Sequence, residues 1–566
     1  MRRPLLAALP IILGLGFGPV AMAQDVGQGL AGPYLAARAA VLEGNHRIAA
    51  TYFETALAAD PGNPVLIGNA IFANAALGQW MRAATIAAML PAESGGQELV
   101  NLVGMVQGMA AGDLADVRAA IAAGQGAGPL IDDLAMGWIY LGEGDMRRAT
   151  DAFLSIAADE SLSDIAYTHL AYARAAVGDF EGADAILSGD AFGPLSASPR
   201  AVRARAEVLM QLDRRKDALE LLDFYTNLVP DPAMLALRTQ IAAASTLTGY
   251  SFITTAQQGV AEVFYGIARI LAGENGSGTL PLLYARAAHG IDPAHSEALI
   301  LAGELLRDAG QFELAADTYV EVGTDDPQFV DAQLGRADAY FEVGREEDAV
   351  VVLRDLAAQN PGLATVQAAL GDALRRTDRC DEAVVAYTTA LNLVDITQTR
   401  AWFLYYTRGI CHEVLDDFAG SEADFRQALV LNPEQPQVLN NLGYSLVEQR
   451  RNLDEALDMI ERAVAARPDS GYIVDSLGWV LYRLGRFDEA VEPMERAVAL
   501  LPTDPIVNDH LGDVYWMVGR KREAQFQWQR ALSFDPEEGD ATRIRRKLEI
   551  GLDRVLEDEG GVGEQR

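Results

Sequence analysis

The strongest constraint on the fold of this chain is a pattern of small residues and prolines that repeats every 34 residues near the C-terminus. The segment from Ser470 to Pro502 and the segment from Asp504 to Pro536 align without a gap. The residues that recur in register are Gly478 and Gly512, Gly485 and Gly519, Ala490 and Ala524, Ala497 and Ala531, and Pro502 and Pro536. A fixed period of this length is typical of solenoids, in which small units stack and each contacts only its neighbours. The chain is therefore expected to present an extended surface and not a single globular core.

Each repeat is predicted to form two helices joined by a tight turn. In the unit around Gly478, one helix face is formed by Val474, Leu477 and Leu481. Gly485 ends the first helix, because glycine accepts the left-handed conformation of a helix cap. Pro502 ends the second helix, because proline cannot continue it. Gly478 and Ala490 lie on different helices, and their small side chains allow the two helices to approach closely.

This pattern resembles that of the tetratricopeptide repeat (TPR) family, with a small residue late in the first helix, another in the second helix and a closing proline. The resemblance implies an all-α fold, a right-handed α-solenoid of helix-turn-helix units. Earlier units are marked by Gly44, Gly137, Gly303, Gly371, Gly409 and Gly443. The pattern gives about 12–14 repeats, fewer of them clear in the N-terminal half. The polar segment from Asp540 to Glu557 is predicted to be a capping helix, which solenoids need at their ends.

The period divides the chain into five predicted segments. These are a signal peptide at 1–23, a degenerate N-terminal repeat array at 24–236, an irregular joint at 237–280, a C-terminal array at 281–536, and a capping helix with a tail at 537–566. The joint is predicted because the period breaks there. Whether it acts as a hinge or is only an irregular repeat stays open.

The N-terminus has the three parts of a secretory signal peptide. Arg2 and Arg3 are followed by an apolar stretch and then by the small residues Ala21 and Ala23 around a cleavage site. We therefore expect export to the periplasm of a Gram-negative bacterium. No cysteine follows the apolar stretch, so the mature chain is expected to carry neither a lipid anchor nor a transmembrane segment.

The charge and the cysteine content limit the classes of partner. The chain has 80 acidic and 45 basic residues, a net charge of −35, which opposes binding to nucleic acid. Its two cysteines, Cys380 and Cys411, fall on predicted helices of adjacent repeats. A disulfide between them and a pair of buried thiols are both compatible with the sequence. Their spacing does not indicate a metal site.

Motifs of catalysis are missing from the sequence. None of the six histidines lies in an H-E-x-x-H motif, and there is no G-x-S-x-G nucleophile motif. The glycine-rich segment from Gly273 to Gly278 lacks the Lys-Ser/Thr pair of a phosphate-binding loop. We therefore predict that the protein is not an enzyme and uses no cofactor or metal.

The TPR resemblance also implies where partners bind, because the first helices of TPR units line a concave groove. The predicted protein-binding residues are Tyr406, Asn440, Tyr444, Asp475, Trp479, Tyr482, Asp509, Asp513 and Trp516. Phe403, Tyr472, Arg483 and Ile506 occupy further groove-facing positions. Asn440, Asp475 and Asp509 would bind the backbone of an extended peptide, and the aromatic residues would bury its side chains. The alternative, that Trp479 or Trp516 packs between neighbouring helices, stays open.

The run L-N-N-L-G-Y-S-L from Leu439 to Leu446 resembles a group of proteobacterial envelope TPR proteins. Members of that group are outer-membrane lipoproteins that partner a carboxyl-terminal processing protease and deliver cell-wall hydrolases to it; this chain lacks their lipidated cysteine. The resemblance implies an adaptor whose partners are an envelope protease, its substrates or assembly factors. The alternative is a passive scaffold for assembly of a cell-envelope or secretion complex.

Overall fold

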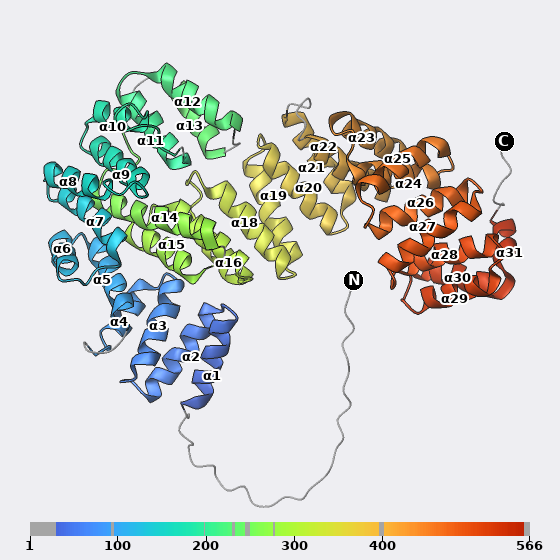
Figure 1. Ribbon diagram of the computed structural model, residues 1–566, viewed down its shortest axis with the longest axis horizontal. Coiled ribbons are helices and arrows are strands. Elements are labelled where there is room, and N and C mark those ends of the chain that lie inside the picture. The colour runs from blue at the N-terminus through green and yellow to red at the C-terminus, as the bar shows by residue number, and fades with distance from the viewer. Residues whose placement is uncertain are drawn as a thin grey trace, which may run out of the picture. The chain divides into compact units, whose positions relative to one another are not determined.

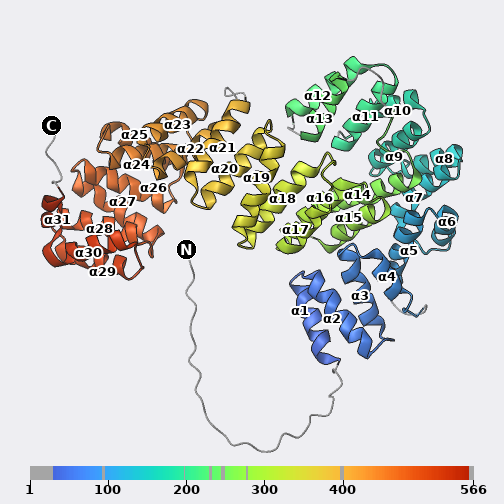
Figure 2. The same cartoon turned by 180° about the vertical axis from the view of Figure 1, so that it is seen from behind.

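The computed structural model describes residues 30–91, 96–196, 198–228, 232–243, 249–275, 278–394 and 401–559. Within these ranges the chain forms 31 helices and no strand, which confirms the predicted all-α solenoid (Figures 1 and 2). The predicted signal peptide and residues 560–566 of the predicted tail lie outside them. The chain divides into two compact units, Met1–Gln328 and Phe329–Arg566, which we call unit 1 and unit 2.

Unit 1 contains the first 17 helices of the described chain. They are α1 (Ala31–Leu42), α2 (His46–Ala59), α3 (Pro64–Ala76), α4 (Trp80–Ala87), α5 (Gln97–Ala111), α6 (Leu114–Ala122), α7 (Pro129–Gly142), α8 (Met146–Ile156), α9 (Ser163–Ala176), α10 (Phe180–Leu187), α11 (Pro199–Gln211), α12 (Arg215–Leu228), α13 (Pro232–Ala243), α14 (Ala256–Asn275), α15 (Thr279–Ile291), α16 (Ser296–Asp308) and α17 (Phe312–Val320). Consecutive helices from α1 to α12 pair as six hairpins, and α14 to α17 form two more.

The inner face of the N-terminal hairpins is occupied by the chain itself. Helix α14 packs against α7, and α15 packs against α3 and α5, which are first helices of their hairpins. Both views show α14 to α16 between α1–α4 on one side and α9–α13 on the other (Figures 1 and 2). The Trp80 indole N–H donates to the backbone carbonyl of Arg286 at 3.0 Å. The N-terminal array therefore curves around later helices of the same chain.

A buried ionic cluster fastens these helices to the array. Arg200 on α11 lies 2.6 Å from a carboxylate oxygen of Glu262 on α14 and 2.6 Å from one of Glu297 on α16. Nε2 of His295 lies 3.3 Å from the same oxygen of Glu262. Burial alone would raise the pKa of Glu262, but Arg200 and His295 outweigh it and lower the pKa to about 2. Glu262 is therefore ionised and paired, which joins three helices that are distant in sequence.

The segment 237–280, predicted as a joint, lies wholly inside unit 1. It includes the end of α13, an extended stretch at residues 249–255 and the 20-residue helix α14. The division between the two units instead falls between Gln328 and Phe329. The break in the repeat period thus marks the place where the chain turns back onto its own array.

Unit 2 contains six further hairpins and a cap. Its helices are α18 (Phe329–Glu342), α19 (Glu346–Gln359), α20 (Ala364–Arg376), α21 (Cys380–Leu393), α22 (Trp402–Val414), α23 (Phe418–Leu431), α24 (Pro436–Glu448), α25 (Leu453–Ala466), α26 (Gly471–Arg483), α27 (Phe487–Leu500), α28 (Pro505–Met517), α29 (Lys521–Leu532), α30 (Glu538–Ile550) and α31 (Leu552–Asp558). With the eight hairpins of unit 1, the described chain forms 14, at the upper end of the predicted range.

In six of the described hairpins the two helices meet where a glycine faces a large side chain 16 residues later in the sequence. The pairs are Gly137 and Phe153, Gly303 and Tyr319, Gly371 and Tyr387, Gly409 and Phe425, Gly478 and Met494, and Gly512 and Trp528. A methyl group added at these glycines would lie 2.4–2.7 Å from the facing side chain. The glycines are thus needed for close approach of the helices.

The predicted capping helix is two helices, and the prediction of one continuous helix from Asp540 to Glu557 was wrong. The break falls at Gly551, which has φ +84° between α30 and α31. A side chain here would be strained, and an added methyl group would lie 2.9 Å from the ring of Trp516. The turn at Gly551 brings α31 back over the last repeat.

Replacing Gly512 by alanine is expected to destabilise unit 2 by about 1–3 kcal/mol, because the new methyl group would overlap the Trp528 ring. The matched control is Gly539→Ala in α30, where no atom lies within 4 Å of the added methyl group. There alanine should stabilise the helix by about 0.5–1 kcal/mol. Urea unfolding followed by circular dichroism measures both changes. Equal stability of the two variants would contradict the role of the close approach.

Candidate protein-binding groove

First helices of consecutive hairpins in unit 2 line a hollow of about 370 Å³. Its walls come from α24, α26, α28 and the cap helix α30. Three of the predicted binding residues, Tyr444, Trp479 and Asp509, line it. It therefore crosses three repeats at the face that the sequence assigned to the groove.

Trp479 is held mainly by other side chains. Its ring stacks on His510, with ring centroids 3.9 Å apart, and on Tyr482 at 4.8 Å. Its indole N–H donates to a carboxylate oxygen of Glu448 at 2.7 Å. Trp479 and Tyr482 are both buried. The structure thus places most of the Trp479 side chain between neighbouring helices, with part of it facing the hollow.

Asn440, Asp475 and Asp509 were predicted to bind a peptide backbone, but both carboxylates among them contact other side chains of the chain. A carboxylate oxygen of Asp475 lies 3.0 Å from Nδ1 of His510, and both residues are buried. Burial by itself lowers the pKa of His510, but the carboxylate and hydrogen bond of Asp475 outweigh it, and the pKa stands above its usual value. Asn440, the third of these predicted residues, is half-buried.

Asp509 and Asp513 hold the cap helix through a buried lysine. Lys547 on α30 has a fully buried side chain, and its ammonium donates to Asp509 at 2.7 Å and to Asp513 at 2.6 Å. The indole N–H of Trp528 donates to Asp513 at 2.9 Å. Burial, with the nearby charge of Asp513, raises the pKa of Asp509 despite Lys547. These two carboxylates close the end of the groove.

Lys547 was not among the residues predicted from the sequence, although a signal was present. Only Lys216, Lys521 and Lys547 are lysines in a chain with 45 basic residues. A lysine inside the arginine-rich segment R-I-R-R-K of α30 is therefore unusual here. Its position opposite Asp509 and Asp513 depends on how α30 folds back, which the repeat period does not specify.

Trp516 lies under the cap and not in an open groove. Its ring is tilted against Trp528 with centroids 5.3 Å apart, and the ammonium of Lys521 lies 4.3 Å from its ring centre. Gly551 approaches it at the turn between α30 and α31. Tyr406 and Tyr444, by contrast, are half-buried on α22 and α24, so part of each side chain faces solvent.

The most exposed predicted groove positions are apolar. Phe403, Tyr472 and Ile506 are 44%, 60% and 48% exposed and lie in the first turns of α22, α26 and α28. Corresponding positions in successive first helices lie on the same face of a solenoid. These side chains therefore form a row of exposed apolar positions, which we call the apolar row, and Gln437 takes the corresponding position on α24.

Arg483 is a charged group in the hollow whose guanidinium lies beside an aromatic ring. It lies at the end of α26, half-buried, with its guanidinium 5.8 Å from the ring centre of Trp479. No hydrogen bond or ion pair joins it to any residue in the ranges described. Burial lowers its pKa, only partly countered by the charge of Glu448. An acceptor group from another molecule would satisfy this guanidinium.

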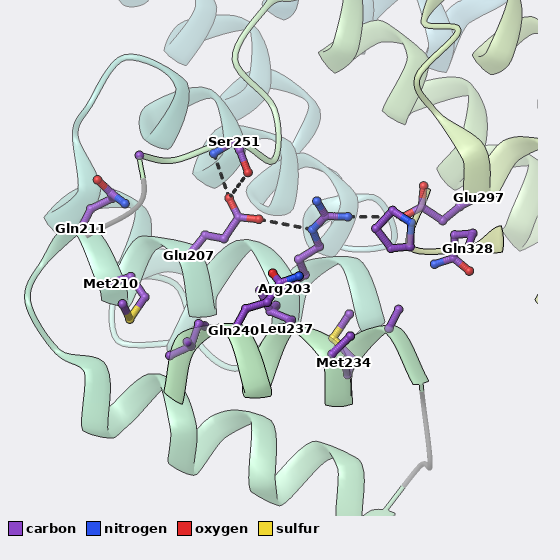
Figure 3. A pocket seen from close by; sticks show the side chains of 15 residues that line it. Arg203, Glu207, Met210, Gln211, Met234, Leu237, Gln240, Ser251, Glu297 and Gln328 are labelled. Carbon is purple, nitrogen blue, oxygen red and sulfur yellow. Dashed lines mark hydrogen bonds and ion pairs between the residues drawn. The ribbon is translucent and has the colours of Figure 1, made fainter. Parts of the chain in front are cut away.

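A second hollow, of about 280 Å³, lies in unit 1 between α11, α13 and α16 (Figure 3). Met210, Met234 and Leu237 form apolar parts of its lining. The charged residues of its wall form ion pairs with one another, because Arg203 lies 3.3 Å from Glu207 and 3.7 Å from Glu297. Glu207 also accepts hydrogen bonds from the backbone and hydroxyl of Ser251. This wall secures the segment that precedes α14.

None of the helices in the described ranges is both long and apolar enough to cross a membrane. No group of three or more His, Cys, Asp or Glu side chains in the same ranges is arranged to hold a metal ion.

Replacing Lys547 by methionine is expected to cost about 3–5 kcal/mol, because Asp509 and Asp513 would stay buried without their cation. The matched control is Lys521→Met, since Lys521 pairs with Asp553 at 3.4 Å on the exposed surface. Such an exposed pair contributes about 0–1 kcal/mol. Hydrogen exchange over α28 to α31 reports the loss locally. Unchanged protection in the Lys547 variant would contradict the role of this lysine in holding the cap.

The pair of Asp475 and His510 is expected to make stability depend on pH. The pKa of His510 is higher in the folded chain than its unfolded value of about 6.5. Its stabilisation is therefore complete below that unfolded value and is lost as pH rises through the folded pKa. The advantage of the wild type over Asp475→Asn in urea midpoint should thus be larger near pH ~6 than near pH ~9.

The control repeats this comparison in a His510→Gln background, where the effect of Asp475→Asn should no longer depend on pH in this range. A wild-type advantage that is equal at both pH values would show that His510 does not carry the effect.

Comparison with known proteins supports the repeat assignment. Two family models, both described as tetratricopeptide repeat, match this chain, one at residues 406–471 and 441–505 and the other at 306–373. The TPR repeat-containing protein PA4667 of Pseudomonas aeruginosa is 30% identical over 198 residues, which is 35% of this chain and 32% of that protein. The chain thus spans about a third of the length of this curated relative.

Solved structures show a general likeness at low sequence identity. The APC/C hetero-tetramer Cut9–Hcn1 is 15% identical, with a TM-score of 0.37, over 93% of this chain and 97% of that chain. A tetratricopeptide repeat protein from Parabacteroides merdae is 15% identical, with a TM-score of 0.37, over 46% and 99%. YrrB, a TPR protein, is 21% identical, with a TM-score of 0.28, over 34% and 97%. The matches to the family models and the helix pairs seen in the same segments agree, and residues 306–373 and 406–505 are tetratricopeptide repeats.

Proposed function

We propose that the protein is a non-catalytic scaffold that binds an extended segment of a partner protein along the groove of unit 2. TPR units typically form protein-interaction scaffolds and not catalytic sites. The observation that carries the proposal is the hollow across α24, α26 and α28, with exposed apolar residues at its edge. Inside it lies Arg483, which makes no hydrogen bond or ion pair with the residues that the structure describes. The inner face of unit 1 does not compete for this role, because α14 and α15 cover it.

The groove offers two kinds of contact to a peptide. Tyr472 and Ile506 provide exposed apolar surface, and burial of such surface contributes about 25 cal/mol per Å². Arg483 donates to a carbonyl or carboxylate oxygen of the partner, which compensates for its partial burial. The carboxylates of Asp475, Asp509 and Asp513 act indirectly, because they position His510 and Lys547 at the floor and the end of the groove.

The cellular role belongs to the same proposal. The signal-like N-terminus supports export to the periplasm, and the pattern L-N-N-L-G-Y-S-L supports a partner in the cell envelope. We propose an adaptor that presents substrates to an envelope protease. Cell fractionation tests the location: the full chain should be recovered in the periplasm, and a variant without residues 2–23 should stay in the cytoplasm. Equal distribution of both forms would overturn the proposed export.

Site-specific photo-crosslinking in living cells tests the binding surface. A photoreactive amino acid replaces Tyr472 in the groove or, as the matched control, Phe526 on α29, a second helix of its hairpin. Both positions are exposed, at 60% and 70%, so neither change should disturb folding. Crosslinks at position 472 that are missing at position 526 would support the groove, and mass spectrometry would identify the partner. Crosslinks at 526 alone would favour the passive-scaffold alternative.

Removing the apolar row is expected to weaken binding of a partner identified in this way. Tyr472→Ala and Ile506→Ala should each reduce affinity by about 5–30-fold, because groove anchors typically contribute about 1–2 kcal/mol. Phe526→Ala should leave affinity unchanged. Isothermal titration calorimetry with the purified partner measures all three. Equal affinities for the groove and control variants would place the binding site elsewhere.

A further inference from the structure

The two cysteines of the chain meet inside unit 2. Cys380 is the first residue of α21, and Cys411 lies on α22. The two helices pack directly against each other, and both cysteines are buried. The two thiols are neighbours, and Cys380 is one of the groups that raise the pKa of the Cys411 thiol. With no other cysteine in the sequence, each thiol has only one possible partner within its own chain.

The junction between these two helices is irregular in sequence. The interhelical glycines Gly409 and Gly443 are 34 residues apart, whereas Gly371 and Gly409 are 38 apart. Four additional residues therefore separate α21 from α22 relative to the regular period.

We propose that Cys380 and Cys411 are a disulfide site, which links α21 to α22 covalently when the chain meets an oxidant that itself carries a disulfide. The link would join consecutive repeats at the junction where the repeat spacing is longest in this part of the chain. This assignment does not depend on the groove of unit 2 or on any partner.

The reaction is a thiol–disulfide exchange in two steps. The thiolate of Cys380 attacks one sulfur of the oxidant's disulfide, forms a mixed disulfide and releases one thiol. Cys411 then loses its proton and attacks the sulfur of Cys380, which releases the second thiol. Two protein thiols thus lose two electrons and two protons, and the oxidant's disulfide is reduced to two thiols.

The environments of the two cysteines set this order. Burial, with the neighbouring Cys380 thiol, raises the pKa of the Cys411 thiol, so Cys411 is a poor first nucleophile. Cys380, the first residue of α21, is therefore the thiol that attacks first in the proposed order. Because both thiols are buried, the oxidant reaches Cys380 during folding or local opening.

The direct test is a thiol count on the full chain. The protein is unfolded in reducing buffer, refolded in a mixture of oxidised and reduced glutathione, and then denatured and alkylated. We expect no alkylated cysteine and an intact mass lower than that of the reduced chain by two hydrogen atoms. Two alkylated cysteines, or a protein that retains glutathione, would overturn the proposal. Disulfide-linked dimers on a non-reducing gel would overturn it as well.

The variants test the order of steps and the effect of the link. Cys411→Ser should trap glutathione on Cys380, because the resolving thiol is missing. The wild type should melt roughly 5–10 °C higher when oxidised than when reduced, since the link restricts the unfolded chain. A Cys380→Ala/Cys411→Ala double variant should melt at the same temperature in both buffers. If the wild type also had the same melting temperature in both buffers, the link would not restrain the unfolded chain.

Discussion

The contact between a glycine on one helix and a large side chain on the next is the interaction on which the solenoid depends. In the pair of Gly512 and Trp528 the indole ring lies where a β-carbon would be, so the two helices pack closely. The same contact recurs with tyrosine, phenylalanine or methionine as the large partner. Because the interior of these hairpins is filled in this way, they can vary elsewhere and still present their two outer faces to their neighbours.

Stacking such hairpins creates an inner face, and the two units use it differently. In unit 1 the chain returns with α14 and α15 and covers that face, held by the ion pairs of Arg200 with Glu262 and Glu297. Buried charges of this kind specify one arrangement, because any other packing would leave a charge without its partner. In unit 2 the face stays accessible across α24, α26 and α28, and the cap closes its end through Lys547.

The groove of unit 2 therefore has a floor and an edge with different properties. At the floor, Trp479 stacks on His510 and Asp475 holds the imidazole, so these groups stabilise the stack of repeats. At the edge, Tyr472 and Ile506 are exposed, so they contribute less buried contact to the fold. Arg483 lies between the two, partly buried but without a partner in the described chain. A surface built in this way keeps its shape while its binding contacts change.

The sequence by itself determined the helical fold and the two-helix unit, and it predicted a face for binding. These follow from local rules, since Gly478, Gly485 and Pro502 specify close approach, a turn and a helix end within one repeat. Only the tertiary structure decided which groove residues are free. Asp509 and Asp513 were expected to face a ligand, but Lys547 reaches both after the chain turns at Gly551. Likewise, nothing in the repeat period indicates that α14 lies against α7. Both outcomes depend on contacts between residues far apart in sequence, which a local pattern cannot specify.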